Sequence, residues 1–206
     1  GHEPDPTKTP QEIYDLGTAE LEDTYGFKSL GQFGFNNTYV ITVMPEFAAL
    51  HNLEKISDLK NIAHLLHGGF TYEFMNRVDG IIGLEDRYDF EFGETSALEG
   101  TLRYTALMNG DVNVTSAFGT DSLIEKLGLF VLEDDLGVFP PYYAFPLLSA
   151  QTYERFPDLL PLMAELQSVL ISDAVMISLN YMVDEGHMEP RTVARNFLLE
   201  KGLISE

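Results

Sequence analysis

The chain has 206 residues, of which 45% are hydrophobic and 12% aromatic, so it is long and apolar enough to bury a core and fold as a globular protein. Acidic residues outnumber basic ones by 33 to 12, and the resulting net charge of −21 excludes nucleic acid as a partner, because binding to phosphates depends on clustered Lys and Arg. The chain has no cysteine, which excludes disulfides, thiolate metal sites and cysteine nucleophiles.

Helix signals and apolar periodicity predict helices that alternate with strands. Thr9, Pro10 and Glu12 suit the N-cap, the first helical turn and the third position of a capping box. The predicted elements are a helix from Thr9 to Tyr25, a strand 39–44, a short helix 57–66, a strand 68–74, helices 81–88 and 98–108, a strand 112–118, a helix capped by Thr120 and Asp121, strands 129–135 and 144–148, and helices 158–169, 172–184 and 190–201. This alternation is typical of parallel βαβ units with helices on both faces of a sheet, so the predicted fold class is α/β.

Four polar stretches lie at the margins of predicted strands. They are "GFNNTY" (34–39), "EFMNRVDG" (73–80), "SAFGTD" (116–121) and "FPPYYAFP" (139–146). In open α/β sheets, ligands bind beyond the carboxyl ends of the strands. The sequence therefore predicts that a ligand site is formed from these stretches.

Metal and catalytic sites have weaker support. His64 and His67 in "HLLHGG" lie three residues apart on a predicted helix, but no further ligand follows at a suitable spacing, which favours a solvated helix end. The acidic run 133–135 lacks the spaced ligands of a calcium loop and is interpreted as a solvated strand exit. No serine elbow, phosphate-binding glycine loop or nucleophile with its base is present, so we predict neither an enzyme nor a bound cofactor.

Aromatic residues at the strand margins indicate a different chemistry. Tyr39, Phe118 and Tyr142 each lie beside small or polar residues, although a single aromatic in such a place is more typical of a core. Together they suit a quaternary ammonium group, which donates no hydrogen bond and binds aromatic faces through cation–π attraction. Arg77 can bind a carboxylate through two hydrogen bonds, or it can form a structural ion pair with a neighbouring acidic residue, Asp79 or Glu73.

Five segments resemble, in order and spacing, the substrate-binding proteins of bacterial ABC importers for glycine betaine, choline, carnitine and related compatible solutes. They are "GFNNTY", "FTYEFMNRVDG", "LRYTALMNGDVNVTSAFGTD", "LEDDLGVFPPYYAFPLL" and "LNYMVDEGHMEPRTVARNFLLEKGLI". The resemblance implies a type II periplasmic-binding-protein-like fold, in which two α/β lobes joined by a two-stranded hinge close over the ligand. It assigns residues 1–41 to a partial lobe I with a hinge strand, 42–142 to lobe II and 143–206 to a return to lobe I.

The resemblance also implies what individual residues do. The implied ligand-binding residues are Tyr39, Phe118 and Tyr142 as aromatic walls, Arg77 for the ligand carboxylate, Asn37 for the ammonium end, and Thr120 with Asp121 for the loop that carries Phe118. The implied partners are a small quaternary ammonium solute and the permease subunit of the importer. The implied location is outside the cytoplasm, at the cell surface or in the periplasm, with the domain tethered by a lipid anchor or fused to the permease.

Two departures from the family pattern leave alternatives open. The chain has "AFGTD" where the family usually has "AYSTD", so Phe118 keeps the aromatic face without the phenol hydroxyl. With the bulky Tyr143 and Phe145 beside Tyr142, this also fits a different cargo, such as an aromatic betaine like ergothioneine or a bile-salt-like molecule.

The second departure is at the start of the chain. Family members carry roughly one further βαβαβ segment before the helix that begins at Thr9. We therefore expect an incomplete lobe I: either the chain is a fragment of a longer protein, or another copy covers its exposed apolar surface. A further interpretation is that the domain binds no solute and serves as an assembly or sensory module.

Overall fold

The chain folds into two units in the computed structural model, which describes residues 8–205. The central unit is one continuous stretch, Thr38–Pro140, whereas the flanking unit combines Gly1–Asn37 with Pro141–Glu206. The chain therefore passes between the units twice, after Asn37 and after Pro140. The assignment of these stretches to lobes I and II stays a prediction.

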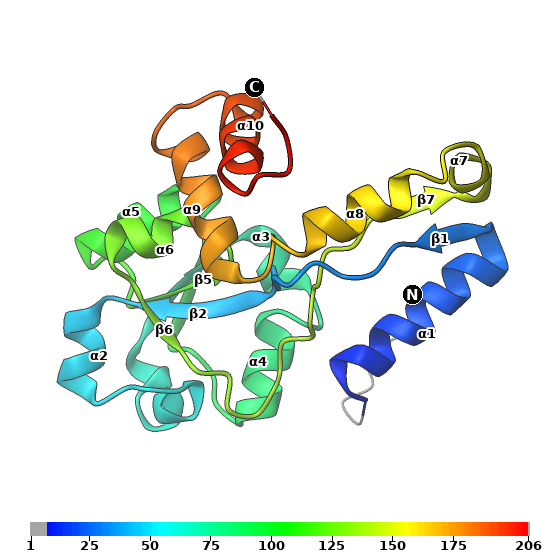
Figure 1. The fold of residues 1–206 in the computed structure, drawn as a ribbon. Coiled ribbons are helices and arrows are strands. Elements are labelled where there is room, and N and C mark those ends of the chain that lie inside the picture. Colours follow the sequence, from blue (N-terminus) through cyan, green and yellow to red (C-terminus); the bar gives the residue numbers. More distant parts are fainter. Residues whose placement is uncertain (1–7, 206) are drawn as a thin grey trace. The chain divides into compact units, whose positions relative to one another are not determined.

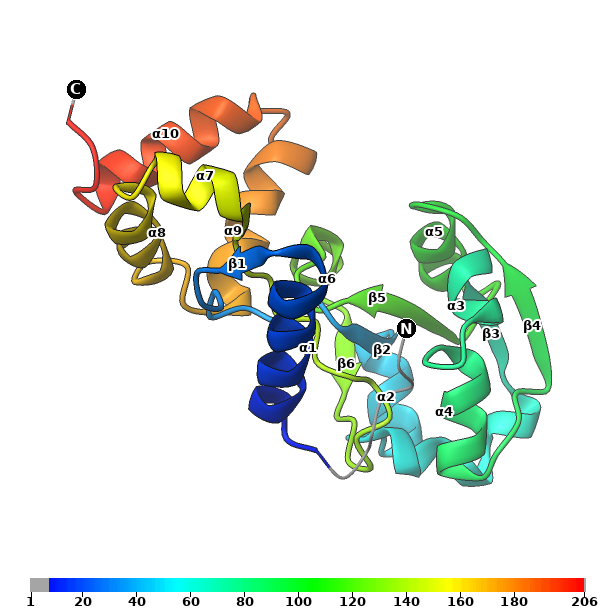
Figure 2. The ribbon, with the colours of Figure 1, turned by 90° about the vertical axis from the view of Figure 1, so that its right-hand side faces the viewer.

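The central unit is built on a five-stranded mixed sheet. Its elements are β2 (Tyr39–Val43), α2 (Pro45–His51), the 3₁₀ helices η1 (Ile56–Asn61) and η2 (Ala63–Leu65), β3 (His67–Phe70), α3 (Tyr72–Asn76), α4 (Ile81–Tyr88), β4 (Glu94–Ala97), α5 (Leu102–Asn109), β5 (Val114–Phe118), α6 (Ser122–Leu127) and β6 (Phe130–Leu132). The strand order is β4-β3-β5-β2-β6. Figure 1 shows β2 between β5 and β6. β3 runs parallel to β4 and β5 (Figure 2), whereas β2 runs antiparallel to β5 and β6. The α/β class is confirmed, but the sheet is mixed and not formed by parallel βαβ units alone.

Alternating side chains of β2 and β5 supply the cores on both faces of this sheet. Tyr39 and Ile41 join the larger buried cluster with α2, α3 and α4, whereas Val40 packs with α5 and α6 in the smaller cluster. On β5, Phe118 packs against the larger cluster and Ala117 belongs to the smaller one. Because both faces are covered, a slip of one residue would exchange the two sets of side chains, so burial fixes the strand register.

The structure corrects several predicted boundaries, two of which lie between β3 and α5. The predicted strand 68–74 ends at Phe70, because the Thr71 hydroxyl accepts a hydrogen bond from the Phe74 N–H (3.2 Å) and caps α3. The helix predicted over 98–108 begins at Leu102, after the strand β4. β4 lies at the edge of the sheet and reads "ETSA", so no apolar alternation marks it in the sequence.

The two histidines of "HLLHGG" do not share a helix. His64 lies in η2, whereas His67 is the first residue of β3. The Nε2 atom of His67 lies 2.8 Å from the Ser96 hydroxyl on β4, and its backbone N–H donates to Asn113 Oδ1 (2.9 Å). The prediction of a solvated helix end is therefore wrong for His67, which joins β3 to its neighbours.

The flanking unit consists of helices and a two-stranded antiparallel ribbon. Its elements are α1 (Pro10–Tyr25), β1 (Phe27–Ser29), β7 (Leu147–Ser149), α7 (Ala150–Arg155), α8 (Leu159–Gln167), α9 (Asp173–Asp184) and α10 (Pro190–Glu200), with β1 paired to β7. The predicted capping box of α1 is confirmed, since the Glu12 carboxylate accepts the Thr9 N–H (2.7 Å) and the Thr9 hydroxyl accepts the Glu12 N–H (3.3 Å). The three predicted C-terminal helices are also confirmed.

Few apolar side chains of the flanking unit are buried. Among the residues that the structure describes, Val193 is the only hydrophobic residue of this unit in the buried core. Leu16 of α1, Leu162 of α8 and Ile171 are 56%, 53% and 63% exposed. Part of this surface is therefore apolar, and self-association through it stays a prediction. No helix within residues 8–205 has the length and apolar character needed to cross a bilayer.

Candidate functional site

Tyr39 and Phe118 form an aromatic pair at one end of the two central strands. They lie directly opposite each other in the β2–β5 register, and their rings stack with centroids 5.0 Å apart and planes 27° apart. Tyr39 is the first residue of β2 and Phe118 the last of β5, so antiparallel pairing places both side chains on one face at the same end. The structure thus brings together two of the three predicted aromatic walls.

Two further aromatic rings enclose Tyr39. Phe74 of α3 meets it in an edge-on contact with centroids 5.0 Å apart and planes at 74°, and the ring of Phe139 lies 6.0 Å away. Tyr39 is 5% exposed, whereas Phe118 is partly exposed. Tyr39 is therefore also a core residue, and Phe118 is the member of the pair with the more accessible ring.

Arg77 follows α3 and is engaged in ion pairs. Its Nε and Nη2 atoms donate to the two carboxylate oxygens of Asp79 (2.7 and 2.6 Å), and Nη1 donates to Glu73 (3.2 Å). Burial raises the pKa of the Tyr39 hydroxyl, and the charge of Glu73 raises it further while Arg77 opposes this effect. The structural ion pair that the sequence leaves open is thus present, and carboxylate binding by Arg77 stays a prediction.

The other predicted ligand-binding residues are divided between the units. Thr120 follows β5 in the central unit and is buried. Asn37 and Tyr142 lie in the flanking unit, where the Asn37 N–H donates to the Tyr142 carbonyl (3.2 Å) and the Tyr142 N–H donates to Asn36 Oδ1 (2.7 Å). These bonds pair the two segments next to the points where the chain passes between the units. The part that Asn37 and Tyr142 take in ligand binding stays a prediction.

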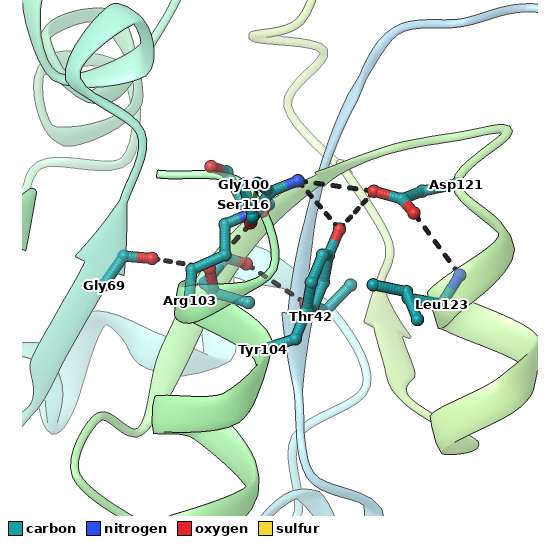
Figure 3. Close-up of polar contacts among 9 residues, drawn as sticks. Thr42, Gly69, Gly100, Arg103, Tyr104, Ser116, Asp121 and Leu123 are labelled. Atoms are coloured by element: carbon teal, nitrogen blue, oxygen red, sulfur yellow. Dashed lines mark hydrogen bonds and ion pairs between the residues drawn. The ribbon is translucent and has the colours of Figure 1, made fainter. Parts of the chain in front are cut away.

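A buried arginine holds the segment that carries Phe118 (Figure 3). Arg103 of α5 is 6% exposed. Its hydrogen bonds run from Nε to the Ser116 carbonyl (2.9 Å), from Nη1 to the Gly100 carbonyl (2.6 Å), and from Nη2 to the Tyr104 hydroxyl (3.0 Å) and Asp121 Oδ2 (3.3 Å). Asp121 also accepts hydrogen bonds from the Tyr104 hydroxyl and from the Leu123 N–H (3.3 Å), and it caps α6.

Sequence reasoning identifies Asp121 but misses Arg103 and Tyr104. Both lie within the quoted segment "LRYTALMNGDVNVTSAFGTD". The sequence nevertheless contains a signal for Arg103. On one helix, Tyr104 lies three residues and Arg103 four residues before Leu107, so Arg103 lies near the apolar face of that helix. A charge near such a face requires a partner, and Asp121 follows the next strand.

Asp134 holds the loop that carries Phe139. Its carboxylate accepts hydrogen bonds from the Tyr88 hydroxyl (2.6 Å) and from the N–H groups of Val138 (3.0 Å) and Phe139 (2.9 Å). Burial and the Asp134 carboxylate both raise the pKa of the Tyr88 hydroxyl. The interpretation of residues 133–135 as a solvated strand exit is therefore wrong for Asp134, which positions Phe139 beside the aromatic pair.

Comparison with known protein families covers most of the chain. The model of the OpuAC family, described as the substrate-binding domain of the ABC-type glycine betaine transport system, matches residues 9–200. The chain belongs to this family. OpuAC domains are solute-binding parts of transport systems and not enzymes, in agreement with the predicted lack of catalysis.

Two curated relatives of this OpuAC chain carry names with different solutes. The chain is 33% identical over 182 residues to the ergothioneine transport permease/ergothioneine binding protein EgtU of Helicobacter pylori, and 32% identical over 192 residues to the carnitine transport binding protein OpuCC of Listeria monocytogenes. The alignments cover 88% and 93% of this chain but 33% and 62% of the relatives. The chain thus spans less than two thirds of the length of either relative.

Solved structures confirm the type II periplasmic-binding-protein-like fold. The crystal structure of a glycine betaine/carnitine/choline ABC transporter protein is similar with a TM-score of 0.84 at 31% identity, and the match covers 96% of this chain and 72% of that one. The apo YehZ protein of Escherichia coli is similar with a TM-score of 0.72 at 24% identity, over 94% of this chain and 72% of that one. At that identity, the second match supports the fold alone.

Proposed function

We propose that this domain captures a quaternary ammonium compatible solute, such as glycine betaine, choline or carnitine, and delivers it to the permease of an ABC importer. The observation that carries the proposal is the OpuAC family match over residues 9–200. The name of the Listeria relative includes carnitine, and that of the similar crystal structure includes glycine betaine, carnitine and choline. Under this proposal the domain acts outside the cytoplasm, held at the membrane by a lipid anchor or by fusion to the permease.

The chemistry of the central unit suits such a cation. A trimethylammonium group donates no hydrogen bond and is attracted to aromatic faces. Phe118 provides a partly exposed ring, and Tyr39 stacks against it and restricts its orientation. Glu73 and Asp79 place carboxylates near this pair, and the net charge of −21 adds a field that attracts cations.

Replacing Phe118 by leucine is expected to weaken the binding of choline by about 2- to 30-fold, since a cation–π contact contributes about 0.5–2 kcal/mol. Leucine keeps much of the apolar volume and removes only the aromatic face. Isothermal titration calorimetry measures the dissociation constant. Phe118→Tyr is the matched control, because it keeps the aromatic face and is expected to bind choline nearly as well as the parent. Unchanged affinity in Phe118→Leu would remove Phe118 from the site.

Replacing Arg77 by alanine is expected to weaken glycine betaine about tenfold or more, because a charge-assisted hydrogen bond to the ligand carboxylate is lost. Choline has no carboxylate, so its affinity is expected to change far less. Titration of both solutes, with unfolding measured in parallel, separates binding from stability. Arg87→Ala is a control in the same unit, since Arg87 donates to the Leu136 carbonyl and is exposed. Equal losses for both solutes in Arg77→Ala would show that Arg77 acts through its ion pairs alone.

An aromatic betaine such as ergothioneine is a second candidate cargo. It is favoured by the 33% identity to the Helicobacter relative over 88% of this chain. Phe118 in place of the usual tyrosine, and the bulky Tyr143 and Phe145, also fit a larger solute. Competition between glycine betaine and ergothioneine for the same protein distinguishes the two: tighter binding of ergothioneine would assign the aromatic cargo, and tighter binding of glycine betaine would exclude it.

A non-binding assembly module is the remaining candidate. The exposed apolar residues of α1 and α8 in the flanking unit favour it. Size-exclusion chromatography with light scattering gives the oligomeric state, and calorimetry gives solute binding on the same sample. A dimer that binds none of the solutes would support the assembly role, whereas a monomer that binds one of them would contradict it.

A further inference from the structure

We propose that Arg103 is a positioning residue of the solute site, because it fixes the turn that carries Phe118. The proposal rests on the proposed function, in which Phe118 contacts the solute. Arg103 lies on α5, which packs with the smaller buried cluster on the face of the sheet opposite the Tyr39–Phe118 pair. It therefore acts through the backbone and not by touching the solute.

The guanidinium of Arg103 forms hydrogen bonds to residues on both sides of Phe118 in the sequence. Nε donates to the carbonyl of Ser116 (2.9 Å), two residues before Phe118, and Nη2 donates to Asp121 Oδ2 (3.3 Å), three residues after it. Between these points, the Asp121 N–H donates to the Phe118 carbonyl (2.9 Å) and the Gly119 N–H donates to the Thr38 carbonyl (2.8 Å). One buried group thus holds both the end of β5 and the start of α6.

The hydrogen bonds among Arg103, Tyr104 and Asp121 depend on one another. Arg103 and Tyr104 are 6% and 2% exposed, and both bond to the same oxygen of Asp121. Without the guanidinium, the Ser116 carbonyl and the Asp121 carboxylate lose a donor in a site that admits little water. The turn is then expected to open so that Asp121 reaches solvent, and Phe118 moves with it.

Leu107 anchors α5 through apolar packing and takes no part in the side-chain hydrogen bonds that hold the turn. Leu107 of α5 is 2% exposed and belongs to the smaller buried cluster. Leu107→Ala therefore loosens the packing of α5 and leaves the bonds of Arg103 in place. It is the matched control that separates a general loss of stability from a displaced turn.

The test uses the absence of tryptophan from the chain. Phe118→Trp places a single fluorophore in the turn, and acrylamide quenching reports how exposed it is in the protein without solute. Adding Arg103→Met is expected to raise the quenching constant about twofold or more, whereas adding Leu107→Ala leaves it unchanged. Arg103→Lys keeps the charge beside Asp121 but lacks the planar fork, so it provides a milder variant that is expected to raise quenching while remaining folded.

A second readout is the affinity for choline, measured on the same variants made in the protein that keeps Phe118. Arg103→Met and Arg103→Lys are expected to weaken choline more than Leu107→Ala does. Equal quenching in the Arg103 and Leu107 variants, or choline binding by the parent with no change in the Arg103 variants, would overturn the positioning role alone. A parent protein that binds no quaternary ammonium solute would overturn the proposed function and, with it, this role of Arg103 in the site.

Discussion

Replacing Asp121 by asparagine is expected to lower the free energy of unfolding by about 3–5 kcal/mol, because breaking a buried ion pair leaves its partner uncompensated. Asparagine keeps the shape of the side chain and caps a helix about as well as aspartate, so the start of α6 is preserved. The change removes the carboxylate that pairs with Arg103, whose side chain is 7% exposed. Urea unfolding followed by circular dichroism measures the effect.

Glu125→Gln is the matched control for this prediction. Glu125 lies on the same helix and is exposed, so losing its charge is expected to change the free energy of unfolding by no more than about 0.5 kcal/mol. Similar small changes in both variants would show that Arg103 does not depend on Asp121, and the account of the buried network would then be wrong.

Replacing Gly80 by alanine is expected to lower the free energy of unfolding by about 3 kcal/mol, because the added methyl group overpacks a core that cannot adjust. A Cβ atom at Gly80 would lie 2.0 Å from the carbonyl oxygen of Phe74 and 2.9 Å from its carbonyl carbon. Neither side can give way easily, since Phe74 is fully buried and Gly80 joins α3 to α4. The same urea unfolding experiment measures this loss.

Gly110→Ala is the comparison that isolates the steric cause. Gly110 ends α5 with a φ of +78°, and a Cβ atom there would meet no other atom within 4 Å. This variant carries only the strain of a left-handed backbone, about 1–2 kcal/mol. If Gly80→Ala were no more destabilising than Gly110→Ala, the close approach of the Phe74 carbonyl would not limit position 80.

Local sequence patterns predict those elements of the fold that have recognisable capping residues or a clear apolar alternation. The capping residues Thr9 and Glu12 give the start of α1, and apolar alternation gives β2 and β5. The edge strand β4 escapes prediction because it pairs on one side and carries polar residues. The strand β1 has three residues, too few for a period of two to appear, whereas the strand predicted over 144–148 is shifted to β7, Leu147–Ser149.

The sequence predicts which residues line the candidate site, and their part in binding stays a prediction, but it does not predict their surroundings. The quoted segments lead to Phe118 and Arg77, yet the burial of Tyr39 depends on Phe74 and Phe139, which come from distant parts of the chain. In the same way, the pairing of Arg103 with Asp121 requires β5 to bring the chain back beside α5. Such contacts are tertiary, so a local pattern can indicate that Arg103 needs a partner but does not specify which one.

The most direct test of the central claim is a calorimetric comparison of choline with 3,3-dimethylbutan-1-ol, in which carbon replaces the charged nitrogen. The two molecules have nearly the same shape, so only the cationic charge differs. The proposed function predicts saturable heat from choline and an affinity for the alcohol that is about tenfold weaker or more, because a neutral group gains no cation–π attraction. Equal affinity for the two molecules, or no heat from choline, glycine betaine and carnitine alike, would contradict the assignment of a quaternary ammonium site to this chain.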